Sequence, residues 1–161
     1  MTVLPSSAAR ATPVAPARLA EIVRAVAQRP ETWRRLVRFQ SDRRWYQRLV
    51  LAEQHEIWLL SWLPGQHTGF HDHGDSAGAF AVAHGELLER AAPGGRPERS
   101  GRVLSAGAVR SFGAAYVHDV RNDSALPTVS IHAYSPPLLT MRRYKAASDG
   151  VLRAAGEERE W

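Results

Sequence analysis

From Trp45 onward the chain is a series of short β-prone runs, each closed by a turn. Glycine, proline, asparagine and aspartate mark these turns, as in Leu63-Pro64-Gly65. Many short strands joined by tight turns favour a small antiparallel barrel or jelly roll, so we expect an all-β fold. The predicted strands cover residues 45–51, 56–63, 69–73, 79–84, 86–91, 102–104, 108–111, 118–121, 128–134 and 139–144.

The first part of the chain has a different pattern. Residues 1–15 are rich in alanine, proline, serine and threonine without a period, which predicts a flexible arm. Leu19 and Val26 belong to an apolar repeat that predicts an amphipathic helix over residues 16–28, and a second short helix is expected around Trp33. The expected organisation is an arm at 1–15 and one domain at 16–161, with short helices at 16–43, a barrel at 44–145 and a tail at 146–161.

The composition excludes several classes of protein. The 161 residues include no cysteine, so a disulfide framework, a zinc ribbon, an iron–sulfur cluster and a thiol nucleophile are ruled out. A transition metal would need histidine or carboxylate ligands, and the chain has seven histidines. The net charge of +5 comes from scattered arginines, so we expect no nucleic-acid partner. No apolar run approaches the roughly 20 residues of a membrane helix, and we expect a cytoplasmic monomer.

His71 and His73 are the first candidates for metal ligands. Residues i and i+2 of a strand project from the same face about 6–7 Å apart, which allows two imidazoles to converge on one ion. An isolated His-x-His is as often a solvated or buried pair, so the surrounding spacing has to decide.

That spacing resembles the two motifs of the cupin superfamily. The first motif is a glycine, five residues, His-x-His, usually a glutamate, and a closing glycine, and the second places another histidine downstream. The matching residues are Gly65, His71, His73, Gly78 and Gly85 for the first motif, and Gly107, His118 and Asn122 for the second. Gly78 stands at the glutamate position, so the resemblance implies three neutral ligands, His71, His73 and His118. Such a site leaves the full charge on a divalent ion and favours anionic ligands such as a thiolate.

One branch of the cupins is closer still, the cysteine dioxygenase (thiol dioxygenase) family, in which three histidines bind a mononuclear non-haem iron. The segment Ser-Ile-His-Ala-Tyr-Ser-Pro-Pro, which begins at Ser130, is similar to that family's Ser-x-His-x-Tyr-Ser-Pro-Pro. The resemblance implies that Tyr134 helps to position the substrate, that His132 orients Tyr134 and that Ser130 orients His132. It also implies a cis Ser135-Pro136 bond.

Tyr46-Gln47-Arg48 is similar to the Tyr-x-Arg of the same family, whose arginine binds the substrate carboxylate. A guanidinium group can bind a carboxylate through two parallel hydrogen bonds. A plain surface role for Arg48 stays open. Members that act on 3-mercaptopropionate typically carry glutamine here, so Arg48 favours cysteine, whereas a one-residue shift onto Gln47 would reverse that preference. Gly78 also stands where animal members have the cysteine of a cysteine–tyrosine cross-link, so the resemblance implies an unmodified Tyr134.

The resemblance as a whole implies an Fe2+ thiol dioxygenase that oxidises L-cysteine with O2 to cysteine sulfinic acid, so that a small thiol and O2 are the expected partners. Three alternatives remain. One is a dioxygenase of another small thiol acid, such as 3-mercaptopropionate or mercaptosuccinate. The second is a zinc or manganese cupin isomerase or hydrolase. The third is a metal-binding cupin without turnover.

Overall fold

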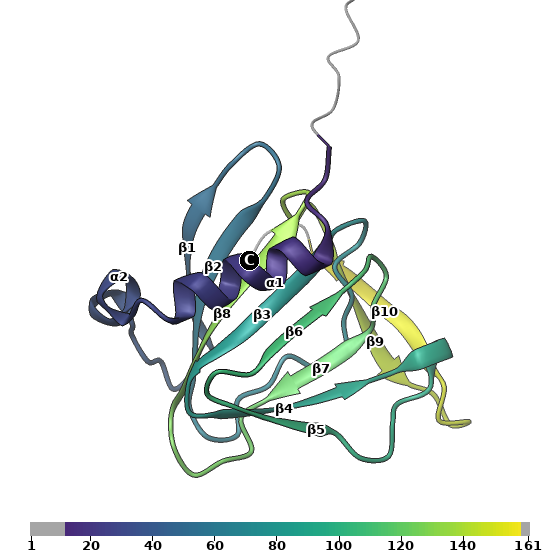
Figure 1. Cartoon of the computed structure of the whole chain (residues 1–161). Helices are drawn as coiled ribbons and strands as arrows, with labels where there is room; N and C mark the ends of the chain where they lie inside the picture. Colours follow the sequence, from purple (N-terminus) through teal and green to yellow (C-terminus); the bar gives the residue numbers. More distant parts are fainter. Residues whose placement is uncertain (1–11, 159–161) are drawn as a thin grey trace, which may run out of the picture.

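The computed structural model describes residues 12–158, which form an antiparallel β-structure preceded by two short helices (Figure 1). None of the helices in this part of the chain is long and apolar enough to cross a membrane. The helical elements are α1 (Pro16–Ala27), α2 (Pro30–Trp33) and the 3-10 segments η1 (Arg34–Leu36) and η2 (Pro93–Gly95). The strands are β1 (Trp45–Leu51), β2 (Glu56–Trp62), β3 (Ala77–His84), β4 (Glu86–Ala91), β5 (Arg102–Ser105), β6 (Val109–Phe112), β7 (His118–Arg121), β8 (Thr128–Ser135), β9 (Met141–Ala146) and β10 (Leu152–Glu158). The predicted all-β fold with N-terminal helices is confirmed.

The strands form three sheets. The largest has the order β1-β2-β8-β3-β6, and the smaller sheets have the orders β5-β4-β7 and β10-β9. Side chains of the five-stranded and three-stranded sheets share one buried interior, which includes Phe80 of β3, Leu87 of β4, Leu104 of β5 and Val120 of β7. The two sheets therefore enclose the space in which a site can form.

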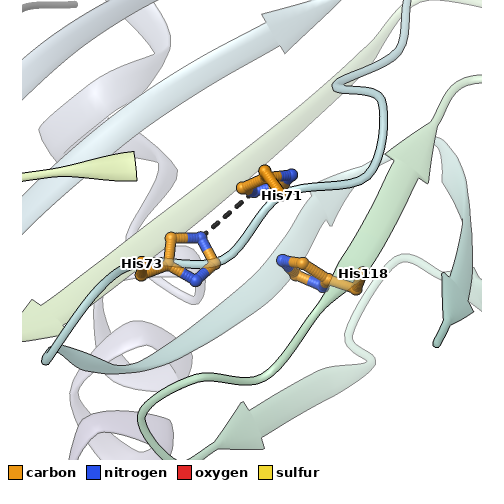
Figure 2. A group of neighbouring side chains, drawn as sticks. All are labelled: His71, His73 and His118. Carbon is orange, nitrogen blue, oxygen red and sulfur yellow. Dashed lines mark hydrogen bonds between the residues drawn. The ribbon is translucent and has the colours of Figure 1, made fainter. Parts of the chain in front are cut away.

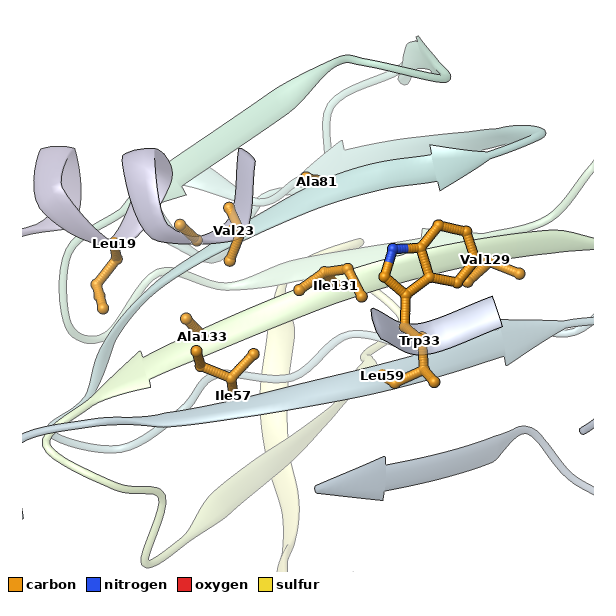
Figure 3. Close-up of a cluster of buried hydrophobic side chains, with 10 residues drawn as sticks. Leu19, Val23, Trp33, Ile57, Leu59, Ala81, Val129, Ile131 and Ala133 are labelled. Atoms are coloured by element: carbon orange, nitrogen blue, oxygen red, sulfur yellow. The ribbon is translucent and has the colours of Figure 1, made fainter. Parts of the chain in front are cut away.

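Strand β8 is buried along its whole length because both of its faces are covered. Val129, Ile131 and Ala133 pack against the helical layer, in which Leu19 and Val23 of α1 are fully buried (Figure 3). The alternate residues of β8 face the interior of the barrel. This alternation follows from the period of two in a strand, and it gives the helices their role as the outer cover of the large sheet.

Two segments differ from the prediction. Residues 69–73 are not a strand but a loop held by isolated bridges from His71 to His118 and to Arg143. The physical reason is that Gly69 and Gly74 on either side have positive φ angles of 70° and 58°, which interrupt an extended backbone. The predicted tail contains a strand, because β10 pairs with β9 in antiparallel register. Its side chains are mostly exposed and do not alternate, so the linear pattern carried no signal for it.

The predicted arm at 1–15 falls mostly outside the described residues, since the structure begins at residue 12. Its last part is attached to the domain. The backbone N–H of Val14 donates to the hydroxyl oxygen of Ser135 at 2.7 Å, at the end of β8. The peptide bond between Ser135 and Pro136 is cis, as the family resemblance implied.

Candidate metal centre and its cavity

Three buried histidines converge on one point, as Figure 2 shows. His71 and His73 lie in the loop between β2 and β3, and His118 is the first residue of β7. One ring nitrogen of each lies within 4.8 Å of the others, and the Nε2 atoms of His71 and His73 are 3.1 Å apart. Backbone hydrogen bonds of 3.0 Å in both directions between His71 and His118 fix the loop to β7. The structure therefore brings together the three histidines that the two motifs singled out.

The electrostatics of this group suit a cation. Burial and the neighbouring His118 hold the pKa of His71 well below its ordinary value, and burial and His71 do the same for His73. Both rings are therefore neutral, which is the form that binds a metal. The Nε2 atom of His118 is buried and has no hydrogen-bond partner among the described residues. A buried nitrogen without a partner is costly, and a metal ion in the group would satisfy it. The residues fit a divalent transition metal with three imidazole ligands.

Gly78 has no side chain that could act as a fourth ligand, and the space beside it is filled. A Cβ atom at this position would lie 2.5 Å from Cε2 of Phe112 and 3.0 Å from Cδ1 of Tyr134. The rings of Phe112 and Tyr134 both lie against His73, with centroids 5.1 and 4.8 Å from its ring. A glutamate or cysteine side chain at residue 78 would need these rings to move. The departure from the usual cupin pattern is thus built into the packing.

Ser130, His132 and Tyr134 form a hydrogen-bonded row on the inner face of β8. The Ser130 hydroxyl lies 2.8 Å from Nε2 of His132, and Nδ1 of His132 lies 3.3 Å from the Tyr134 hydroxyl. Trp62, the last residue of β2, also donates its indole N–H to Ser130 at 2.9 Å. The row therefore has four members, and it runs from the buried Trp62 to the Tyr134 hydroxyl.

Protonation limits the hydrogen bonds of this row. Burial lowers the pKa of His132 to about 3, so its ring is neutral and has one N–H donor and one acceptor. The ring therefore donates one of its two contacts, with the Ser130 hydroxyl or the Tyr134 hydroxyl, and accepts the other. Burial also raises the pKa of Tyr134, so that the phenol stays protonated and can act as a donor.

A cavity of about 440 Å³ opens beside His71 and His118. The cavity includes His132 and Tyr134 of the row, so the histidine group and the row face the same space. Apolar residues contribute to its wall, among them Leu60, Val120, Leu138 and Met141. A pocket of this size, with an apolar wall and a few converging polar groups, is typical of a site for a small molecule.

The cationic residues of the wall differ from the sequence prediction. Arg44 and Tyr46 line the cavity, whereas Arg48 is not among the described lining residues. The guanidinium group of Arg48 instead contacts the buried Glu56 carboxylate at 3.4 Å and lies 5.4 Å from the Trp58 ring. The structure thus brings Tyr46 to the site and leaves Arg48 beside Glu56. Arg44 precedes the first residue of β1, and the Tyr-x-Arg pattern carried no signal for it.

Arg44 lies over the ring of Trp62 at 4.9 Å, and no carboxylate of the described residues forms an ion pair with it. Burial and the neighbouring Arg143 lower the pKa of Arg44, which shows that the charge is held at a cost. Arg143 is already engaged, because it donates to Glu158 of β10 at 2.8 Å and to the carbonyl oxygen of Thr68 at 2.9 Å. Arg43 also lines the cavity but is exposed, so Arg44 is the half-buried arginine of the wall with the greater capacity to bind an anion.

Two buried carboxylates lie close to the histidines in the chain or in space. Asp72, between two of them in the sequence, accepts hydrogen bonds from Tyr144 at 2.7 Å and from the backbone of Gly74 at 2.9 Å and so holds the loop. Glu89 of β4 lies 2.9 Å from Nδ1 of His118. Burial raises the pKa of Glu89, but hydrogen bonds with His118 and Arg110 outweigh this effect and leave the pKa below its ordinary value. The sequence carried no signal for Glu89, because its partner is distant along the chain.

An antiparallel barrel with three histidines at the edge of an internal cavity defines a cupin with a group that could hold a metal ion. The chain belongs to the cysteine dioxygenase type I family, whose sequence model matches residues 9–147. No curated protein sequence matches the chain.

Solved structures agree on the fold. A protein from Thermus thermophilus is 25% identical, with a TM-score of 0.57 over 65% of this chain and 93% of that chain. A protein with a double-stranded β-helix domain from Klebsiella pneumoniae is 15% identical, with a TM-score of 0.57 over 76% of this chain and 93% of that chain. A sugar phosphate isomerase of the cupin superfamily from Silicibacter pomeroyi is 18% identical, with a TM-score of 0.53 over 71% of this chain and 76% of that chain. These likenesses describe the architecture of the barrel.

Proposed function

We propose that the protein is a mononuclear non-haem iron(II) thiol dioxygenase that converts L-cysteine and O2 to cysteine sulfinic acid. The observation that carries this proposal is the meeting of three buried histidines and the inward-facing row of β8 at one cavity. Family membership supports the same reaction class. The reaction balances without a further reductant, because both atoms of O2 are added to the sulfur of one thiol.

His71, His73 and His118 would hold the iron as three neutral ligands. When bound, iron(II) supplies the redox chemistry through which O2 reacts with a thiol, chemistry that amino-acid side chains cannot supply. Because the three ligands carry no charge, the centre favours an anionic thiolate over a neutral thiol.

The chain itself would bind and orient the substrate. The guanidinium group of Arg44 is placed to bind the substrate carboxylate, with the Tyr46 hydroxyl beside it in the same wall. At the other side of the cavity, the Tyr134 hydroxyl is held by His132, whose Nδ1 atom lies 3.3 Å from it. The apolar residues Leu60 and Val120 keep water away from the reacting sulfur. Fixing both ends of a small thiol in this way lowers the entropic cost of the reaction.

A second candidate is the same reaction on an amine-free thiol acid such as 3-mercaptopropionate. One observation favours it. Among the described lining residues Glu158 is the acidic one, and its carboxylate is already engaged by Arg143, so no free carboxylate of this part of the chain faces a substrate ammonium group. Both candidates share the carboxylate that Arg44 would bind.

The test is oxygen uptake by protein that is purified anaerobically and loaded with Fe(II). L-Cysteine, 3-mercaptopropionate and cysteamine are compared, and the products are identified by mass. We expect a gain of two oxygen atoms on the carboxylate-bearing thiols and little turnover of cysteamine, which has no carboxylate. His118→Ala should lose iron and activity with the fold retained, whereas His84→Ala, at the exposed end of β3, should keep both. Iron-loaded protein that takes up no oxygen with any thiol would overturn the proposal.

A further inference from the structure

Glu89 is the one carboxylate of the described residues that hydrogen bonds to a histidine of the metal group. It lies on β4, next to β7, and Ala91 of β4 pairs with His118 in the antiparallel register. The side chain of Glu89 is buried, and its Oε1 atom is 2.9 Å from Nδ1 of His118. The carboxylate therefore approaches the metal group from behind its third ligand.

Both oxygens of Glu89 are held. The Nε atom of Arg110 donates to Oε2 at 2.7 Å, and the hydroxyl of Tyr116 donates to Oε1 at 3.3 Å. Arginine keeps its charge in proteins, so this short contact is an ion pair and Glu89 can only accept hydrogen bonds. The hydrogen of the His118 ring must then be on Nδ1. The lone pair is on Nε2, which is the atom that has no partner among the described residues and faces the other histidines.

His71 has a weaker support of the same kind, since its Nδ1 atom lies 2.9 Å from the carbonyl oxygen of Gly69. A carbonyl group fixes the tautomer but brings no charge. A carboxylate fixes the tautomer and also makes the imidazole a stronger donor to a metal. His118 is thus set apart from His71 by the charge behind it.

We infer that Glu89 is a positioning residue for the metal and acts through His118. Its carboxylate supplies a negative charge next to the three ligands, whereas Gly78, at the position of the usual cupin glutamate, has no side chain to supply one. The inference rests on the proposed function, because it requires a metal at the three histidines. The packing of Phe112 against Gly78 closes the usual place of a carboxylate. Glu89 provides one on the opposite side of His118, where the chain can bury it against Arg110.

The first test concerns the metal-free protein and needs no activity. Nitrogen-15 NMR of the histidine rings reports which ring nitrogen carries hydrogen. We expect the Nδ1–H form for His118. An Nε2–H form of His118 would overturn the inference and leave the three-histidine centre in place.

The second test measures the affinity for Co(II) by calorimetry and the visible absorption bands of the bound Co(II). We expect Glu89→Gln to lower the affinity by about 10- to 100-fold and to shift the absorption bands. Glu89→Asp should recover part of the affinity, because the charge is restored. Glu86→Gln on the same strand is the matched control, since Glu86 faces Ser105 at 3.4 Å and not the metal group. Thermal melts of the metal-free variants, all of which must fold, separate this effect from a loss of structure.

The outcomes separate the two proposals. If the wild type binds Co(II) through His118 and Glu89→Gln binds it equally well with the same spectrum, the role of Glu89 is overturned and the proposed function stands. If the wild type does not bind Co(II), or if His118→Ala binds it as well as the wild type, the metal centre itself is wrong and both proposals fail.

Discussion

The indole N–H of Trp62 lies 2.9 Å from the hydroxyl oxygen of Ser130, and this contact joins strand β2 to the inner row of β8. An indole nitrogen can only donate, so the hydroxyl of Ser130 accepts this bond and keeps its own hydrogen and a second lone pair for other partners. His132 is one such partner at 2.8 Å. The row that ends at Tyr134 is therefore anchored by a residue on the neighbouring strand β2.

Trp62→Phe tests this relationship. The change leaves Ser130 without its buried donor, so we expect a lower kcat with unchanged iron content, and a loss of about 1 kcal/mol of stability beyond the effect of the smaller ring. Trp33→Phe is the matched control, because the buried indole nitrogen of Trp33 has no hydrogen-bond partner within residues 12–158. Urea unfolding and steady-state kinetics measure the two effects. Equal losses in both variants would contradict a role for the Trp62 N–H.

Arg44→Gln is expected to weaken the binding of thiols that carry a carboxylate. A hydrogen bond to a charged group contributes about 1.5–3 kcal/mol, which corresponds to an increase in KM of roughly 10- to 100-fold. Arg48→Gln is the comparison, and we expect a change of less than about threefold because Arg48 pairs with Glu56 outside the cavity lining. Steady-state kinetics with L-cysteine measure both. A larger loss in Arg48→Gln would indicate that Arg48, the residue predicted from the sequence, binds the substrate carboxylate.

Gly78→Ala should destabilise the protein by about 1–3 kcal/mol, since its Cβ would lie 2.5 Å from the Phe112 ring and the core is already filled. Gly113→Ala serves as the control, because no atom of the described residues outside its chain neighbours lies within 4 Å of its Cβ position. In the double variant Gly78→Ala/Phe112→Leu, the smaller leucine side chain should restore part of the lost stability. Chemical denaturation measures all three variants. A Gly78→Ala variant as stable as the wild type would show that the ring can move without cost.

His132 predicts a pH dependence of the stability of the metal-free protein. Its pKa is about 3 in the folded protein and about 6.5 in the unfolded chain, so between these values the unfolded chain binds a proton that the folded protein does not. Stability therefore falls as the pH falls below 6.5, and His132 accounts for about 2 kcal/mol between pH 7 and pH 5. In His132→Gln the loss between these two pH values should be smaller by that amount. Urea unfolding at both pH values decides, and an unchanged pH dependence would argue against a buried neutral His132.

Much of the fold could be predicted from the sequence, because its signals are local. The alternation along β8 places Ser130, His132 and Tyr134 on one face whatever the rest of the barrel does. The turn residues mark most strand ends for the same reason. Strand β10 could not be predicted, since a mostly exposed strand shows no apolar alternation and is held chiefly by its pairing with β9.

The site was predictable only where spacing defines it. The motifs identified His71, His73 and His118, but they carry no information on the register between β1 and β2. The pairing that holds Arg48 opposite Trp58 is set in three dimensions. Glu89 depends in the same way on the pairing of β4 with β7. Contacts that strand pairing creates lie outside what a linear pattern can show.

Because both faces of β8 are covered, the number of residues in the strand is constrained more strictly than their identity. A deletion or insertion of one residue inside the strand would exchange its two faces. Ile131 and Ala133 would then enter the cavity, and the polar row would lie against α1. The loops on either side of β8 can absorb changes in length without this exchange. Engineering of this barrel is therefore best directed to those loops, with substitution alone inside the strand.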